Sequence, residues 1–175
     1  MLVPLVGTST TSEVVDRIVS RMPAPTRHVM LVGSSGGHLA QLCALESWYS
    51  QHDATFVTFR TPDALSRLKG ENVEWAYHPT TRSLRNLARN TGLAARLIWR
   101  VRPDVIVSTG AGVALPFFVL GRLFGAVTVY VEVIDRLDTT TMTGRLCRPF
   151  SSVFCVQWPE QERLYKGAVN IGRLM

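Results

Sequence analysis

The chain has 175 residues, 46% of them hydrophobic, which is enough to bury one core and argues against a disordered protein. Nineteen basic residues against thirteen acidic ones give a net charge of +6, which favours anionic partners such as phosphates, acidic lipid headgroups or nucleic acid.

Arg122 interrupts the best apolar run, so no membrane-spanning helix is expected. Cys43, Cys147 and Cys155 are odd in number and lack paired spacing, so we expect no zinc site, no disulfide framework and no cofactor.

Residues 1–26 are expected to form an N-terminal appendage to a single domain, residues 27–175. The appendage starts with a short apolar stretch, but no basic segment precedes it and Glu13 and Asp16 follow, so it matches a signal peptide poorly. A reducing cytoplasmic setting therefore fits this chain best.

Short β-rich runs alternate with helical patterns along the chain. The expected strands are residues 28–33, 54–59, 73–77, 104–108, 127–132 and 152–157. The expected helices are residues 38–50, 62–69, 83–101, 111–124 and 142–149. Because parallel strands need crossover connections, this alternation predicts an α/β fold with a Rossmann-like parallel sheet and helices on both faces. The nearly continuous apolar runs 29–32, 104–109 and 127–133 are expected in the central strands.

Ligands of such sheets bind beyond the carboxyl ends of the strands, so the loops after three of the strands are candidate sites. The first loop is formed by Gly33, Ser34, Ser35, Gly36, Gly37 and His38. Its glycines allow close approach, and a helix starting near His38 would offer unpaired N–H groups to a phosphate or diphosphate. A tight turn that merely needs glycine is the alternative. The spacing matches neither the dinucleotide fingerprint nor a Walker A loop.

His38 has two interpretations of its own. It could act as a general base near neutral pH or contact a phosphate, or it could be a bystander at the start of the helix.

The second loop repeats this arrangement with Thr109, Gly110, Ala111 and Gly112. Two small-residue loops at neighbouring strand ends favour a binding site over two turns dictated by packing.

The third loop follows Glu132, at the end of an apolar strand. A carboxylate that leaves a buried strand needs a partner, which Arg136 could supply. Alternatively, Glu132 could bind a sugar hydroxyl or support catalysis.

A basic helix is expected over residues 83–101. Arg82, Arg85, Arg89, Arg96 and Arg100 lie within a stripe roughly 60° wide. Leu84, Leu87, Ala88, Thr91, Ala94, Ala95, Ile98 and Val101 are expected on the opposite side, packed on the sheet. Like charges at this spacing repel one another, so anionic lipid headgroups are the favoured partner, with Trp99 at headgroup level. A solvated helix face is the alternative, and no motif supports nucleic acid.

Several segments in the same order resemble a known family: "GSSGGHLAQL", "RPDVIVSTGAGVALPF", "VYVEVIDRLD", "TMTGRL" and "VQWPEQERLY". The chain is similar to the membrane-associated subunit of the two-part UDP-N-acetylglucosamine transferase of dolichol-linked oligosaccharide synthesis. It resembles more closely the PssD-like proteins of bacterial exopolysaccharide and capsule synthesis, and more distantly the MurG-type transferases.

The resemblance implies the acceptor-side half of a split GT-B glycosyltransferase, at the cytoplasmic face of the membrane. A separate chain would bring the UDP-sugar, and the acceptor would be a polyprenyl-diphosphate-linked saccharide. The first loop, the second loop and Arg136 would face its diphosphate. His38 is the first choice for the general base and Glu132 the rival. Trp158 and Tyr165 are candidates for the partner interface.

Eukaryotic members of the family carry an N-terminal membrane anchor, whereas the start of this chain is short and polar, so peripheral attachment is expected. The alternative function is a non-catalytic scaffold that recruits a complete glycosyltransferase to the membrane. An NADP-dependent oxidoreductase that uses Arg60 is disfavoured by the spacing of the first loop.

Overall fold

The computed structural model describes residues 25, 28–80 and 83–175, and the expected appendage therefore lies almost entirely outside the described residues. Seven parallel strands form one sheet in the order β3-β2-β1-β4-β5-β6-β7. They are β1 (His28–Val32), β2 (Asp53–Phe59), β3 (Val73–Ala76), β4 (Val105–Ser108), β5 (Val127–Val131), β6 (Val153–Val156) and β7 (Val169–Asn170). The predicted parallel α/β sheet is confirmed. β7 was not expected, because two residues carry no periodic signal.

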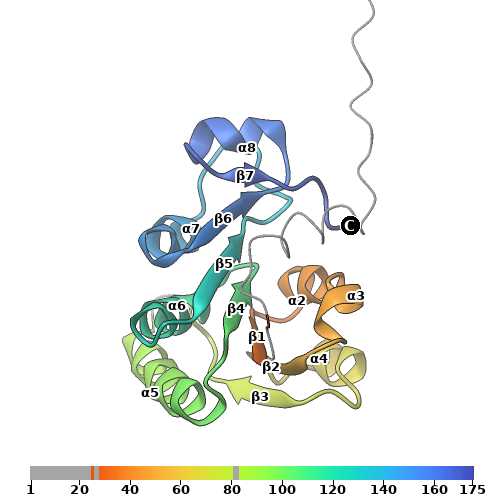
Figure 1. Ribbon diagram of the computed structural model, residues 1–175, viewed down its shortest axis with the longest axis vertical. Helices are drawn as coiled ribbons and strands as arrows, with labels where there is room; N and C mark the ends of the chain where they lie inside the picture. The colour runs from red at the N-terminus through yellow and green to blue at the C-terminus, as the bar shows by residue number, and fades with distance from the viewer. Residues whose placement is uncertain (1–24, 26–27, 81–82) are drawn as a thin grey trace, which may run out of the picture.

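Helices cover both faces of the sheet (Figure 1). On one face lie α2 (Gly37–Cys43), α3 (Glu46–Tyr49) and α4 (Pro62–Arg67). On the other lie α5 (Leu84–Val101), α6 (Ala114–Leu123) and α7 (Met142–Cys147), which a short 3₁₀ turn (Arg148–Phe150) follows. α8 (Pro159–Leu164) precedes β7 at the end of the sheet. The single helix expected over residues 38–50 is divided in two, and α8 was not expected.

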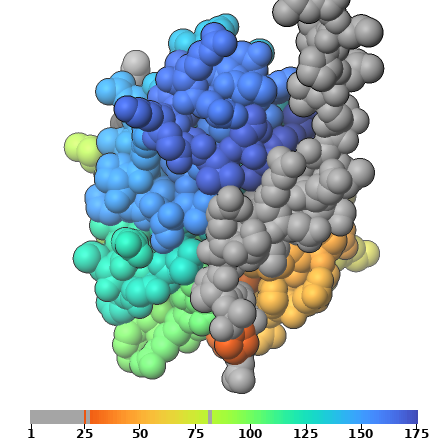
Figure 2. Space-filling view, turned by 45° about the horizontal axis from the view of Figure 1, so that its top comes forward, coloured from red at the N-terminus to blue at the C-terminus, as the bar shows by residue number. Residues whose placement is uncertain are grey.

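The predicted central strands are confirmed: β1, β4 and β5 are neighbours in the middle of the sheet. Their residues are almost all buried, since helices cover both of their faces. In the space-filling view, the C-terminal residues, in blue, lie at one end of the molecule, and the first described residues, in orange, lie toward the other (Figure 2).

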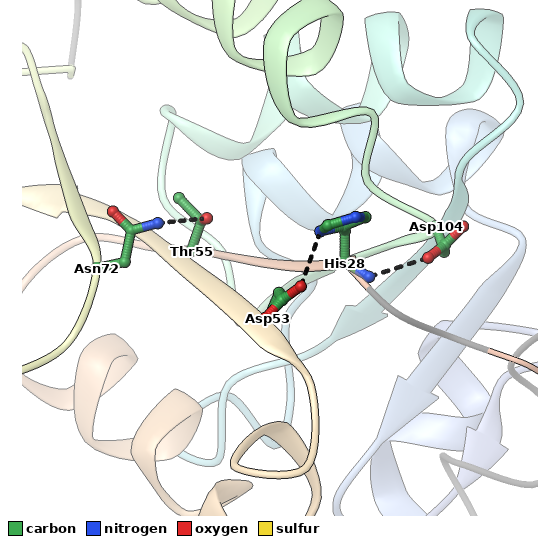
Figure 3. A network of polar contacts seen from close by, with 5 residues as sticks. All are labelled: His28, Asp53, Thr55, Asn72 and Asp104. Carbon is green, nitrogen blue, oxygen red and sulfur yellow. Dashed lines mark hydrogen bonds and ion pairs between the residues drawn. The ribbon is translucent and has the colours of Figure 1, made fainter.

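Polar contacts join strands near their amino ends (Figure 3). The His28 amide donates to Asp104 Oδ2 over 2.9 Å, and His28 Nδ1 lies 3.5 Å from Asp53 Oδ2. Asn72 Nδ2 donates to Thr55 Oγ1 over 3.0 Å. These contacts lie at the amino ends of the strands. The candidate loops emerge at the opposite edge of the sheet, at the carboxyl ends.

The face that α5 packs on the sheet differs from the expected one. The buried residues are Asn86, Asn90, Leu93, Ala94, Leu97 and Ile98. Leu84, expected inside, is 82% exposed. The reason is that two polar residues are paired inside: Asn90 Oδ1 accepts from the Tyr77 amide and Asn90 Nδ2 donates to the Tyr77 carbonyl, each over 2.9 Å. Asn86 Nδ2 donates to the Pro79 carbonyl over 2.9 Å. Hydropathy patterns count such asparagines as surface residues.

Candidate active site at the carboxyl edge of the sheet

The first two small-residue loops lie side by side, because β1 and β4 are adjacent and Val32 is in register with Ser108. His38 Nδ1 lies 2.8 Å from the carbonyl oxygen of Thr109. In return, Thr109 Oγ1 donates to the carbonyl oxygen of His38 over 2.8 Å. A reciprocal pair of hydrogen bonds thus joins two loops that are 71 residues apart in sequence.

This pair determines which imidazole nitrogen carries the proton. A carbonyl oxygen only accepts, so Nδ1 of His38 must donate to Thr109. In the neutral ring, Nε2 then carries the lone pair, and that nitrogen can accept a proton from a substrate hydroxyl. His38 is half-buried, so its ring is held and still reachable.

Two of the glycines predicted to bind the ligand are closely surrounded by other atoms of the protein. Gly110 has a φ of +117°, and a Cβ there would lie 2.9 Å from Tyr130 Oη and 3.0 Å from His38 Cε1. A Cβ on buried Gly33 would lie 3.0 Å from Leu42 Cδ1. Thr109 is also fully buried, with its hydroxyl committed to His38. Close packing thus surrounds Gly33, Thr109 and Gly110, and their contact with the diphosphate remains a prediction.

The remaining small residues of the two loops reach the surface. Ser34, Ser35 and Gly112 are half-buried, and Gly36 and Gly37 are exposed. Gly36 adopts a φ of +72°, where side chains are disfavoured. Contact of these five residues with a diphosphate remains a prediction.

Two residues of this edge were not singled out from the sequence. Asp63 lies at the start of α4, and its Oδ2 accepts a hydrogen bond from the Gly36 amide over 2.8 Å. Thr80 packs against Gly112, where a Cβ would lie 3.0 Å from Thr80 Cβ. The signal that could have found both is their position just after β2 and β3, at the same edge of the sheet.

Glu132 is fully buried, which corrects its expected role as rival general base. Its carboxylate accepts from Thr141 Oγ1 over 3.0 Å, from the Val133 amide over 3.1 Å and from Tyr165 Oη. Burial, first, and the hydrogen bond to Glu132 raise the pKa of Tyr165 to about 12. The partner that burial of this carboxylate requires is therefore a pair of hydroxyls and not Arg136.

Gln157, just after β6, and Gln161 of α8 hold the third loop. Gln161 Nε2 donates to the carbonyl oxygens of Val133 and Arg136 over 2.8 and 2.9 Å. Gln157 Nε2 donates to the Glu132 carbonyl over 2.8 Å. The Arg136 side chain is exposed, and its contact with a diphosphate remains a prediction.

The two predicted interface aromatics have different positions. Tyr165 is 1% exposed, so its side chain cannot form a contact surface for a partner chain, which corrects that prediction. Trp158 is half-buried; its Nε1 donates to the Ile134 carbonyl over 2.9 Å, and the Arg173 guanidinium lies 5.1 Å from its ring centroid. A partner contact at Trp158 remains a prediction.

The predicted arginine stripe lies on the outside of α5, with Arg85, Arg89, Arg96 and Arg100 exposed. Arg82 lies outside the described residues. Arg100 forms an ion pair with Glu74, and the Arg89 guanidinium lies 5.3 Å from the Tyr77 ring centroid. Within residues 28–80 and 83–175, Arg85 and Arg96 have no such partner.

Large apolar side chains are exposed where α5 and α6 end. Trp99, Leu123 and Phe124 are 69%, 75% and 66% exposed. Trp99 and Phe124 line an open hollow of about 580 Å³ together with Arg102. Among the described helices, none is long and apolar enough to span a bilayer.

The family described as "Oligosaccharide biosynthesis protein Alg14 like" matches residues 77–174. The chain belongs to this family. The predicted resemblance to Alg14-type subunits is thereby confirmed. The part that matches the Alg14-like family contains the second loop, Glu132 and α8, whereas His38 and the first loop precede it.

Relatives of this Alg14-like chain include two mammalian proteins named UDP-N-acetylglucosamine transferase subunit ALG14. The Mus musculus protein is 34% identical over 85 residues, 45% of this chain. The Rattus norvegicus protein is 25% identical over 184 residues and covers 87% of this chain and 85% of its own length. The chain spans 39% of the length of the mouse relative.

A solved structure, that of MurG from Acinetobacter baumannii, has a TM-score of 0.67 at 18% identity. The likeness covers 82% of this chain and 44% of that chain. At this identity it concerns the fold alone, and it confirms the predicted Rossmann-like, GT-B type of architecture.

Proposed function

We propose that this chain is the acceptor-binding, membrane-recruiting subunit of a two-chain glycosyltransferase. The complex transfers a sugar from a UDP-sugar to a polyprenyl-diphosphate-linked saccharide. The observation that carries the proposal is the His38–Thr109 pair, which leaves Nε2 of a held imidazole as proton acceptor at the carboxyl edge of the sheet. His38 is the general base that takes the proton of the attacking acceptor hydroxyl.

The partner in this proposal is a separate donor-binding chain. The likeness to MurG covers 44% of that transferase, so a second unit of similar size would complete an enzyme of that architecture. The relatives named as transferase subunits support the same division of labour. Following the resemblance to PssD-like proteins, the product belongs to exopolysaccharide or capsule synthesis.

The membrane face in this proposal is the outer side of α5 and the adjoining end of α6. Arg85 and Arg96 offer unpaired positive charge, and exposed Trp99, Leu123 and Phe124 offer apolar and indole groups. A helix with this composition lies in the plane of an anionic membrane surface, peripheral to it at its cytoplasmic face. Thr80, which precedes α5, packs against Gly112 of the second loop, whereas Trp99 and Phe124 line a hollow with Asp104 and Val127, at the amino ends of β4 and β5. The start of α5 is therefore the end of this helix that lies nearer to the site.

The test is a transfer assay with the chain purified together with its partner. Radiolabelled UDP-N-acetylglucosamine and native membrane lipid are supplied to the wild-type pair, to a His38→Ala pair and to a His28→Ala pair. His28 is the matched control, because it is also half-buried but lies at the opposite edge of the sheet (Figure 3). We expect transfer to require both chains and to fall by about 100-fold or more in the His38→Ala pair alone.

Two results would contradict the proposal. Transfer by the purified single chain would mean that donor and acceptor sites share this domain. Unchanged transfer by the His38→Ala pair would favour the alternative, a non-catalytic scaffold that recruits a complete transferase to the membrane.

A further inference from the structure

We infer that Asp63 is a positioning residue that anchors the loop carrying His38, an inference that rests on the proposed function of His38. The Asp63 carboxylate accepts from the Gly36 amide over 2.8 Å through Oδ2. Its other oxygen accepts from Thr61 Oγ1 over 2.6 Å. Gly36 precedes α2 in the loop after β1, and Asp63 lies in the first turn of α4, 27 positions later, just beyond the neighbouring strand β2.

The Asp63 contact matters because no side-chain packing holds Gly36 in place. Gly36 has a φ of +72° and a ψ of −133°, and a Cβ at Gly36 would have no neighbour within 4 Å, so side-chain packing does not hold this peptide. The carbonyl oxygen of Gly36 accepts from the Ala40 amide over 2.9 Å, which closes the first turn of α2. Asp63 thus holds the amide of Gly36, the residue whose carbonyl oxygen closes the first turn of the helix bearing His38.

His38 is then held from two sides. Thr109, just after β4, holds its ring and its carbonyl oxygen, and Asp63, at the start of α4, holds the preceding turn. A displacement of about 1 Å at a catalytic group is enough to cost on the order of 100-fold in rate. Loss of the Asp63 contact would leave His38 present but free to move about the Thr109 contact.

The carboxylate also restricts what the loop can bind. The pKa of Asp63 is lowered, first by the Thr61 hydroxyl and then by the Gly36 amide, so Asp63 is charged at neutral pH. An anion at the Gly36 amide would meet this negative charge. We therefore expect the acceptor diphosphate to contact this loop through groups other than the Gly36 amide.

The experiment compares Asp63→Ala and Asp63→Asn with the control Asp53→Ala. Asn can keep both contacts, because its oxygen accepts from Gly36 while its amide group donates to the Thr61 hydroxyl. Asp53 lies at the amino end of β2, whereas Asp63 follows the carboxyl end of that strand (Figure 3 shows Asp53). NMR is recorded on the isotope-labelled full chain together with its partner. It measures hydrogen exchange of the Gly36 amide and the chemical shifts of the His38 imidazole nitrogens. Transfer assays measure kcat and KM.

In Asp63→Ala we expect loss of Gly36 protection, altered His38 nitrogen shifts and a fall in kcat of about tenfold or more, with KM for the acceptor lipid little changed. Asp63→Asn should restore all of these, and Asp53→Ala should match the wild type. Wild-type protection and His38 shifts in Asp63→Ala would overturn the inference. So would a rise in KM alone in both Asp63 variants, which would mean direct contact with the acceptor.

Failure of the proposed function is distinguishable from failure of this inference. If the wild-type pair transfers no sugar, the proposed function is wrong, and the NMR measurements still decide whether Asp63 anchors Gly36 and orients His38.

Discussion

His38 and Thr109 form two hydrogen bonds of 2.8 Å in opposite directions: the His38 imidazole donates to the Thr109 carbonyl, and the Thr109 hydroxyl donates to the His38 carbonyl. Neither residue could be exchanged without affecting the other, because the same pair joins the loops after β1 and β4. Because β1 and β4 are adjacent in the sheet, the strand order determines which nitrogen of His38 carries the proton.

Gly110→Ala tests how closely this pair is packed. The new methyl group would lie 2.9 Å from Tyr130 Oη and 3.0 Å from His38 Cε1, at a φ of +117°. We expect a loss of about 1–3 kcal/mol in the free energy of unfolding and lower transfer activity. Urea denaturation measures the first. Gly37→Ala is the control: a Cβ there has no neighbour within 4 Å, so its stability should stay within about 0.5 kcal/mol of the wild type.

Asn90→Ala tests the unexpected polar face of α5. Asn90 is 1% exposed and its side chain satisfies both the amide and the carbonyl of Tyr77, so its removal leaves two backbone groups unpaired. The expected cost is about 2–3 kcal/mol in the free energy of unfolding. Thr91→Ala, on the exposed side of the same helix, should change stability by less than about 0.5 kcal/mol. Equal effects of the two variants would mean that the buried pairing contributes nothing.

Vesicle binding tests the membrane face. Each unpaired arginine near an anionic surface contributes about 1 kcal/mol, or about fivefold in affinity. Arg96→Gln should therefore weaken binding to phosphatidylserine vesicles by about fivefold at low salt. Arg100→Gln should weaken it less, because Arg100 is paired with Glu74. Co-sedimentation at two salt concentrations measures both, and affinities that do not depend on salt would contradict an electrostatic membrane contact.

Tyr165→Phe tests the buried contact to Glu132 through its pH dependence. The pKa of Tyr165 is raised to about 12 from a model-compound value of 10.0, so the unfolded chain loses this proton first as pH rises. The stabilisation is complete below pH 10 and is lost as pH rises from about 10 toward 12. The difference in unfolding free energy between wild type and Tyr165→Phe should be constant from pH 7 to 9. It should then shrink with a slope approaching about 1.4 kcal/mol per pH unit.

A constant difference up to pH 11 would mean that the Tyr165 proton is no more tightly held in the folded protein than in the unfolded one. Absorbance titration of the phenolate in the folded protein provides an independent check on the same group.

Much of the fold was already determined by local sequence. The apolar runs of β1, β4 and β5 and the glycines that follow β1 and β4 are properties of neighbouring residues, so they identify the central strands and the loops of the candidate site. His38 could be chosen as the candidate base for the same reason. The arginine stripe of α5 likewise follows from helical periodicity.

Other features depend on contacts between distant segments, and only the tertiary structure decided them. Glu132 is closed off by Thr141 and Tyr165, the latter 33 residues away, so its accessibility cannot be read from its own neighbours in sequence. Asn90 is buried because the backbone of Tyr77 satisfies its side chain, and the buried face of α5 is rotated from the one expected from hydropathy, with only Ala94 and Ile98 common to both. Asp63 meets Gly36 only because β1 and β2 are adjacent in the sheet. A polar side chain has no fixed preference for surface or interior until its hydrogen-bond partners are known, and here strand order brings those partners together.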